Sequence, residues 1–281
     1  MNNSKMYLGY AGYCLSKEHH AISGGRKKDI VFNALWGLIE HPNEGYILYD
    51  TGYSKRFYKA TKHYPDKIYA QITKVFITAN EEVQAQLKAA GIASESIKHI
   101  VISHFHADHI GGLKDFPNAT FHASQEAVEQ FNKIPKILGF TKGILKELVP
   151  DNFMERISLV NDKTKVKLPI LGECFDVFGD GHLITVPLTG HAAGQIGLLV
   201  ATAKRSYFLI ADSCWLQESY KKGVLPSSMV RLFFYSWKQF KSSLKKITDY
   251  HLNHPETIIV PTHCEKTTNP LVQSKINMND L

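Results

Sequence analysis

The sequence predicts an α/β protein in which two β-sheets lie face to face and helices cover their outer sides. Short apolar runs, which are typical of buried strands, alternate with segments of helical spacing. The second half of the chain also repeats the first in outline. An apolar run that ends at Asp50 is echoed by one that ends at Asp212, and the run before His104 is echoed by the run before His263. This repetition indicates an internal duplication that yields the two sheets.

The composition fits a soluble globular protein. The chain has 281 residues, of which 44% are hydrophobic and 21% charged, and we expect a single domain over residues 1–281. The net charge of +7 comes from scattered basic residues, so nucleic acid is not an expected partner. No apolar stretch of membrane-spanning length and no signal peptide is visible, which favours a cytoplasmic protein without a membrane partner. The four cysteines lack Cys-x-x-Cys spacing and are expected to be reduced thiols.

The first elements of the chain are strands. Residues 6–15 are expected to form the first one. Residues 30–39 and 46–50 flank the turn at 42–45, and this arrangement predicts a β-hairpin. Residues 55–75 are basic and have the pattern of a helix.

A helix is expected before residue 92, and a strand followed by a helix is expected after residue 119. Asn80 is a plausible N-cap for a helix that stops at Gly91. Residues 120–123 predict a short strand, and Ser124 can cap the helix after it.

Two segments show no clear strand pattern. We expect a helical insertion near 124–160, although an ordinary surface connection explains residues 132–160 equally well. A second irregular or helical segment is expected near 214–235. Residues 20–30, 132–160 and 214–235 are candidates for substrate specificity.

The second half predicts four strands and one long helix. The strands are expected at 183–187, 196–200, 207–211 and 258–261. Residues 236–252 carry apolar side chains at helical spacing with lysines on the opposite face, which predicts a helix packed on the core.

The central motif is residues 104–110, where three imidazoles and one carboxylate occur within six positions. It directly follows the apolar run 100–102 and precedes Gly111-Gly112, where the backbone must turn tightly or approach another segment closely. Two side chains that are two positions apart on an extended backbone point to the same side. The first two histidines can therefore face one centre, and the later Asp and His can face a second. This grouping indicates first-row metal chemistry.

Further potential ligands follow other apolar runs. The complete candidate set is His104, His106, Asp108, His109, His191, Asp212 and His263. Imidazoles with carboxylates suit zinc, and also iron, manganese or cobalt. Seven ligands exceed the need of one tetrahedral ion, whereas two ions that share a carboxylate and a water would use them all. We therefore predict two Zn²⁺ per chain, with Fe, Mn or Co as alternatives.

This pattern resembles the metallo-β-lactamase superfamily, which carries His-x-His-x-Asp-His followed by a later His, a later Asp and a last His. The resemblance covers about residues 6 to 265. It implies a four-layer αββα sandwich of two mixed β-sheets flanked by helices. It also implies that Asp50 orients a ligand imidazole. By the same resemblance, the first metal would be bound by His104, His106 and His191, the second by Asp108, His109 and His263, and both by Asp212 as a bridge.

Within that superfamily the layout is most similar to N-acyl-homoserine-lactonase-like hydrolases. Residues 190–195 resemble their Gly-His-x-x-Gly-His, with Gln195 in place of the final His. Those lactonases carry a Tyr three residues after the bridging Asp, where this chain has Trp215. The nearby Tyr220 could supply the phenol instead, or it could be a packing residue.

The resemblance implies hydrolysis of an ester, lactone or thioester in a small-molecule substrate by a metal-bridging hydroxide. Asp108 would accept the proton of the water and pass it to the leaving group. Alternatives are a phosphodiesterase or ribonuclease of the same fold, and a non-catalytic binding protein that retains the fold. A redox di-iron role would require Glu at the position of His106. A homodimer remains an open alternative to a monomer.

Overall fold

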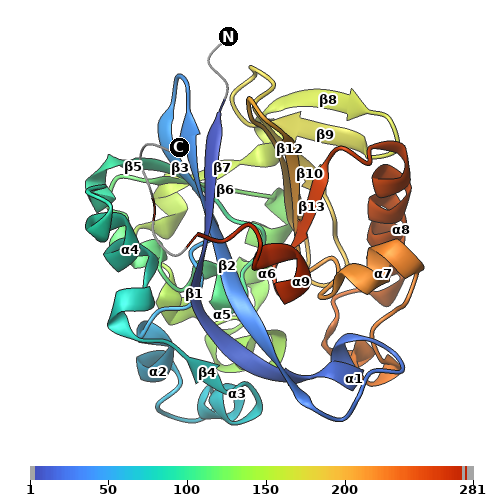
Figure 1. Ribbon diagram of the computed structural model, residues 1–281. Helices are drawn as coiled ribbons and strands as arrows, with labels where there is room; N and C mark the ends of the chain where they lie inside the picture. Colours follow the sequence, from blue (N-terminus) through green and yellow to red (C-terminus); the bar gives the residue numbers. More distant parts are fainter. Residues whose placement is uncertain (1–3, 274–275, 277–281) are drawn as a thin grey trace.

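The computed structural model of the chain describes residues 4–273 and 276. Its core consists of two β-sheets, one with the strand order β4-β1-β2-β3-β5-β6-β7 and one with the order β13-β12-β11-β10-β9-β8. Figure 1 shows α4 on the outer side of the first sheet and α8 on the outer side of the second. The predicted α/β fold with two mixed sheets flanked by helices is therefore confirmed.

The first sheet is built from the N-terminal half. Its strands β3, β5, β6 and β7 are parallel, whereas β1 pairs antiparallel with β2 and β4. The predicted hairpin is confirmed by antiparallel pairing of β2 with β3 up to His41 and Gly45. The strands are β1 (Lys5–Lys17), β2 (Asp29–His41), β3 (Gly45–Tyr49), β4 (Val75–Phe76), β5 (Ile97–Val101), β6 (Thr120–Ala123) and β7 (Ile157–Leu159).

The second sheet is built from the C-terminal half. All its pairs are antiparallel except that of β12 with β13. The four strands expected here are confirmed, but the sequence did not reveal β8 and β9, which lie at the edge and expose most of β8 to solvent. The strands are β8 (Thr164–Leu168), β9 (Gly172–Asp176), β10 (Leu183–Pro187), β11 (Ile196–Ala201), β12 (Ser206–Ala211) and β13 (Ile258–Pro261).

Helices connect and cover the sheets. The expected long helix is α8, whose Phe240, Leu244 and Ile247 are buried against the second sheet. The α-helices are α1 (Glu18–Ala21), α2 (Arg56–Ala60), α3 (Lys67–Ile72), α4 (Val83–Ala89), α5 (Ala107–Ile110), α6 (Gln125–Lys133), α7 (Gln217–Lys222), α8 (Trp237–Asn253) and α9 (Glu265–Thr268). The 3₁₀ helices are η1 (Ala79–Glu81), η2 (Ser94–Ser96), η3 (Leu113–Asp115), η4 (Lys136–Lys142), η5 (Lys146–Leu148), η6 (Phe153–Arg156), η7 (Val160–Asp162) and η8 (Ser228–Phe233).

Local details differ from the expectations at two places. The basic stretch 55–75 forms two short helices, α2 and α3, because Pro65 lies between them and cannot continue a helix. The expected N-cap at Asn80 is wrong. Thr78 and Glu81 instead form a capping box around η1, and Thr78 N donates to Glu81 Oε2 at 2.7 Å. The expected stop is confirmed, because α4 ends just before Gly91, whose φ is +79°.

The two segments with unclear patterns consist largely of short helices. Ser124 caps α6 as expected. Between α6 and residue 156, all the described helices are 3₁₀ helices, namely η4, η5 and η6. The stretch 214–235 contains α7 and η8. That the first segment is an insertion, and that residues 1–281 form one domain, stay predictions.

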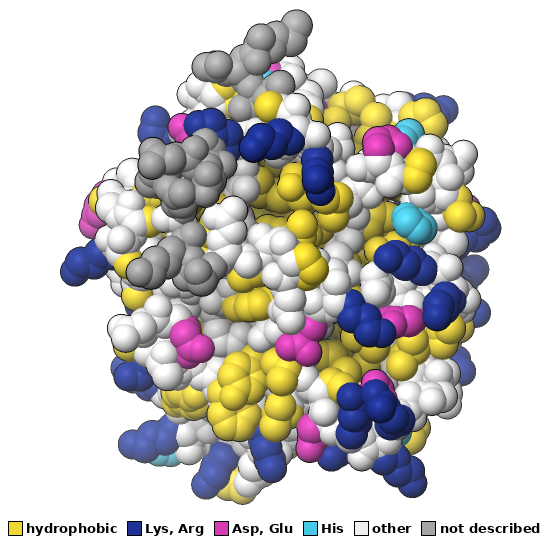
Figure 2. Space-filling view, in the orientation of Figure 1, with side chains coloured by type: hydrophobic (Ala, Val, Ile, Leu, Met, Phe, Trp, Pro, Cys, Tyr) yellow, Lys and Arg dark blue, Asp and Glu magenta, His cyan; other side chains and the backbone are white. Residues whose placement is uncertain are grey.

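Apolar side chains from both sheets fill the space between them. Leu35 and Ile47 of the first sheet pack in one cluster with Leu198, Leu209 and Val260 of the second. Lys and Arg side chains lie at several separate places on the face shown in Figure 2 rather than in one strip. Within the part of the chain that the structure describes, no helix is both long and apolar enough to cross a membrane.

Candidate metal centre

The seven candidate ligands converge at one edge of the sandwich. Each follows the end of a strand: the 104–109 loop follows β5, and the other three loops follow β10, β12 and β13. These strand ends meet because β12 is parallel to β13, and β10 runs in the same direction as β12. Sites outside the carboxyl ends of strands are common in α/β proteins. The ligand atoms group into two sets, His104 with His106, His191 and Asp212, and Asp108 with His109, Asp212 and His263.

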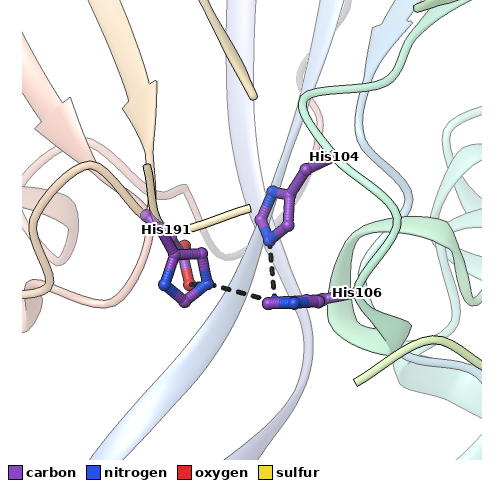
Figure 3. A group of neighbouring side chains, drawn as sticks. His104, His106 and His191 are labelled. Carbon is purple, nitrogen blue, oxygen red and sulfur yellow. Dashed lines mark hydrogen bonds and ion pairs between the residues drawn. The ribbon is translucent and has the colours of Figure 1, made fainter. Parts of the chain in front are cut away.

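In the first set, three imidazole rings are turned toward one another (Figure 3). His106 Nδ1 lies 3.0 Å from His104 Nε2 and 3.1 Å from His191 Nε2. All ligand atoms of the set lie within 4.8 Å of one another. The two histidines of the His-x-His pair thus face one centre, together with a third histidine from the other sheet.

The second set is centred on two carboxylates. His263 Nε2 lies 3.2 Å from Asp212 Oδ2 and 3.4 Å from Asp108 Oδ2. His109 Nε2 lies 3.4 Å from Asp212 Oδ1. Asp212 belongs to both sets. Its carboxylate is therefore placed between two groups of ligand atoms, as a bridging ligand must be.

The donor set fits divalent cations. Among the described residues, the buried atoms His109 Nε2 and Asp212 Oδ1 have no hydrogen-bond partner, and a buried polar atom without a partner is costly. Burial lowers the pKa of His104, and it lowers the pKa of His191 to about 3. Both imidazoles are thus neutral, which is the form that binds metal.

The buried carboxylates at this centre also favour the binding of cations. Burial alone would raise the pKa of Asp212, but His263 and His109 hold it well below its usual range. Burial alone would lower the pKa of His109, but Asp108 and Asp50 are among the carboxylates that hold it well above. The protonated His109 then helps to balance the negative charge of the buried carboxylates. Cations in the centre would take over this role and leave His109 neutral as a ligand.

Other residues orient the ligand imidazoles. His109 Nδ1 lies 2.7 Å from Asp50 Oδ2, and the other carboxylate oxygen of Asp50 accepts from Ser103 N at 2.8 Å. His263 Nδ1 donates to the carbonyl oxygen of Asn33 at 2.8 Å. Both contacts leave Nε2 of the ring facing the centre. The contact between Asp50 and His109 is the one expected for Asp50, which was predicted to orient a ligand imidazole.

The glycines after the motif allow a close backbone approach. Gly111 N donates to Gly52 O at 2.9 Å, and a Cβ on Gly111 would lie 2.6 Å from that oxygen. No larger residue fits without a shift of the backbone. This approach ties the ligand loop to the Asp50 loop.

Two positions depart from the lactonase pattern, Trp215 and Gln195, and each makes a hydrogen bond near the centre. Trp215 Nε1 donates to Asp212 Oδ2 at 3.2 Å. Gln195 is buried and donates to Ser213 Oγ at 2.7 Å. Tyr220 is buried in the core of the second sheet with its ring against His251, which favours the alternative that it is a packing residue.

A pocket opens beside the first ligand set. His106 and His191 line it together with side chains from the two segments of unclear pattern. The sequence predicted that these segments contribute to specificity, but it could not show which of their side chains line the pocket, because that depends on how the two segments fold over the site. The additional lining residues are Phe105, Ala127, Gln130, Lys142, Ile144, Ala192, Ala193, Phe233 and Tyr235.

The two-sheet α/β fold and the His/Asp centre at its edge together identify a hydrolase that depends on divalent metal ions. The model of the metallo-beta-lactamase superfamily matches residues 29–203. The chain belongs to this superfamily.

Similar proteins include two N-acyl homoserine lactonases. AttM of Rhizobium radiobacter is 26% identical over 92% of this chain and 93% of its own length. The lactonase of Bacillus cereus is 24% identical over 80% of this chain and 81% of its own length. A solved N-acyl homoserine lactone hydrolase, with N-hexanoyl-L-homoserine bound at its catalytic metal centre, superposes with a TM-score of 0.75. It covers 96% of this chain at 18% identity, and 97% of that structure is covered.

Proposed function

We propose that the protein is a lactonase that opens the ester bond of a small-molecule lactone with two divalent cations, Zn²⁺ in the first instance. The observation that carries this proposal is the position of Asp212, which belongs to both ligand sets. The similarity to N-acyl homoserine lactonases over 92% of the chain supports the choice of a lactone.

Most of the candidate residues would bind the two cations, and Asp108 would also transfer a proton. When bound, the cation pair lowers the pKa of a shared water toward about 7 and so provides a nucleophile at neutral pH. His104, His106 and His191 would hold one cation, and Asp108, His109 and His263 the other, with Asp212 shared between them. The lowered pKa of His104 and His191 leaves these two imidazoles neutral, and the lowered pKa of Asp212 leaves its carboxylate ionised, which are the forms that bind metal.

Asp108 is the candidate for proton transfer. Its side chain lies at the centre, with Oδ2 3.4 Å from His263 Nε2, and it keeps 7% of its surface exposed. A carboxylate there can accept the proton of the attacking water and return it to the alkoxide oxygen that leaves when the ring opens. The products are then a hydroxyl and a carboxylate on one molecule.

The pocket beside His106 and His191 has room for little more than a water-sized group, so its lining side chains would have to move apart to hold the rest of the substrate. Phe105, Ile144 and Phe233 give it an apolar lining. Binding pockets combine such a lining with few polar groups that fix orientation. We therefore expect lactones that carry an apolar substituent to be better substrates than unsubstituted lactones.

The test combines metal analysis with a substrate screen. Purified protein is analysed for metal and assayed against substituted lactones, thioesters, phosphodiesters and β-lactams. We expect about two ions per chain, lactone hydrolysis, and loss of activity with a chelator that Zn²⁺ restores. Phosphodiester cleavage without lactone cleavage would instead identify a phosphodiesterase of this fold. Bound metal without any turnover would support a binding protein.

A further inference from the structure

Trp215 contacts the centre at the atom that both ligand sets share. Its indole N–H donates to Asp212 Oδ2 at 3.2 Å. The same oxygen lies 3.2 Å from His263 Nε2 and 3.4 Å from His191 Nε2, so it is near a ligand nitrogen of each set. Among the described residues, no other side chain outside the seven ligands is recorded as a hydrogen-bond donor to this oxygen.

The Trp215 ring is held by aromatic neighbours on several sides. Its centroid lies 5.8 Å from Phe32, 5.5 Å from Phe234 and 5.7 Å from the His191 ring. Phe32 in turn stacks on the ring of His263, with centroids 4.6 Å apart and an angle of 6° between the planes. The indole therefore packs directly on a ligand of the first set, and through Phe32 on a ligand of the second.

Without such a donor, the Asp212 carboxylate would be oriented only by contacts with candidate ligand imidazoles, such as His263 Nε2 at 3.2 Å and His109 Nε2 at 3.4 Å. Rotation about the terminal bond of Asp is broad, and Oδ1 of Asp212 has no hydrogen-bond partner among the described residues. A donor on Oδ2 selects the rotation in which that oxygen lies between the two sets. An indole N–H is a donor only, so it can hold the carboxylate but cannot exchange protons with the substrate.

We propose that Trp215 is a positioning residue, which holds the Asp212 carboxylate in place between the two ligand sets. The proposal rests on the metal centre described under the proposed function, but not on the identity of the substrate. It gives Trp215, in the loop after β12, a role in metal binding and not in substrate binding.

The test separates the N–H group from the ring. Trp215→Phe keeps an aromatic ring in the wall and removes only the donor. Trp237→Phe is the matched control. Trp237 stacks on Phe240 of α8, and within the described part of the chain its indole makes no hydrogen bond with Asp212. Metal affinity is measured by chelator competition, and the absorption spectrum of Co²⁺-loaded protein reports the ligand geometry.

We expect Trp215→Phe to weaken the binding of at least one ion by about 10- to 100-fold and to change the Co²⁺ spectrum. Trp237→Phe should leave both unchanged. Two ions bound as tightly by Trp215→Phe as by the parent protein, with the same spectrum, would overturn the proposal. A parent protein that binds two ions but opens no lactone would refute the proposed function and leave this inference standing.

Discussion

His109 and Asp50 lie 59 positions apart in the sequence, yet His109 Nδ1 is 2.7 Å from Asp50 Oδ2 in the buried interior. Both side chains are fully inaccessible to solvent. The contact selects the tautomer of His109 in which Nε2 faces the candidate metal centre. It therefore links a loop of the first hairpin to the ligand loop.

We expect Asp50→Asn to weaken metal binding by about 10- to 100-fold. The amide keeps the shape of the carboxylate but loses the charge, and it can present an N–H to the His109 N–H. Chelator competition measures the effect. Asp115→Asn is the control, because Asp115 is also buried but pairs with Arg56. Equal metal affinities of Asp50→Asn and the parent would contradict the role given to Asp50.

Asp108→Asn should reduce turnover by about 10²- to 10⁴-fold, the usual contribution of a positioned acid or base. Substrate binding should change far less, because the amide has nearly the same size. Steady-state kinetics on the best lactone separate kcat from KM, and metal analysis of the variant shows whether both ions remain. Asp249→Asn on the surface of α8 serves as the control. Unchanged turnover with both ions bound would rule out proton transfer by Asp108.

His122 predicts a pH-dependent stability away from the metal centre. Burial, with His99 and Lys163 nearby, lowers the pKa of His122 to about 3, whereas an unfolded histidine has a pKa of about 6.5. The unfolded chain therefore takes up the proton first. The free energy of unfolding should fall as the pH drops from about 6.5 toward 3, by up to about 1.4 kcal/mol per pH unit for this one group. Above pH 6.5 the contribution of His122 is constant.

Denaturant unfolding of metal-free parent and His122→Asn proteins tests this. Comparing the two slopes of stability against pH cancels the contributions of the ligand histidines. The variant should have the shallower slope between about pH 6.5 and 4. Parallel slopes would show that His122 does not carry this dependence.

Gly190 should not tolerate a side chain. A Cβ at this position would lie 2.1 Å from Phe240 N, and the φ angle of +139° disfavours other residues. Gly181→Ala is the control, since Gly181 has a φ of +82° and no atom within 4 Å of the added Cβ. We expect Gly190→Ala to lower the free energy of unfolding by about 1–3 kcal/mol more than Gly181→Ala. Thermal unfolding measures both, and equal losses would refute the steric argument.

The parts of the fold that the sequence predicted have strong local patterns. Residues 207–211 and 258–261 are apolar runs with clear ends, and both are strands in the structure. The edge strand Thr164–Leu168 was missed, because its lysines face solvent and its pattern has no buried face. The segment 132–160 could not be assigned either, since 3₁₀ turns follow no long periodic pattern.

The sequence by itself determined the fold class and named the seven side chains that the structure brings together, because strand-end positions and ligand types are local features of the chain. Only the tertiary structure decided that Asp212 belongs to both ligand sets, that Trp215 donates to its oxygen, and that Tyr220 packs in the core of the second sheet. These relationships depend on which strands pair, in which register, and how the two sheets face each other. Such long-range packing is a property of the whole chain and cannot be read from any one segment.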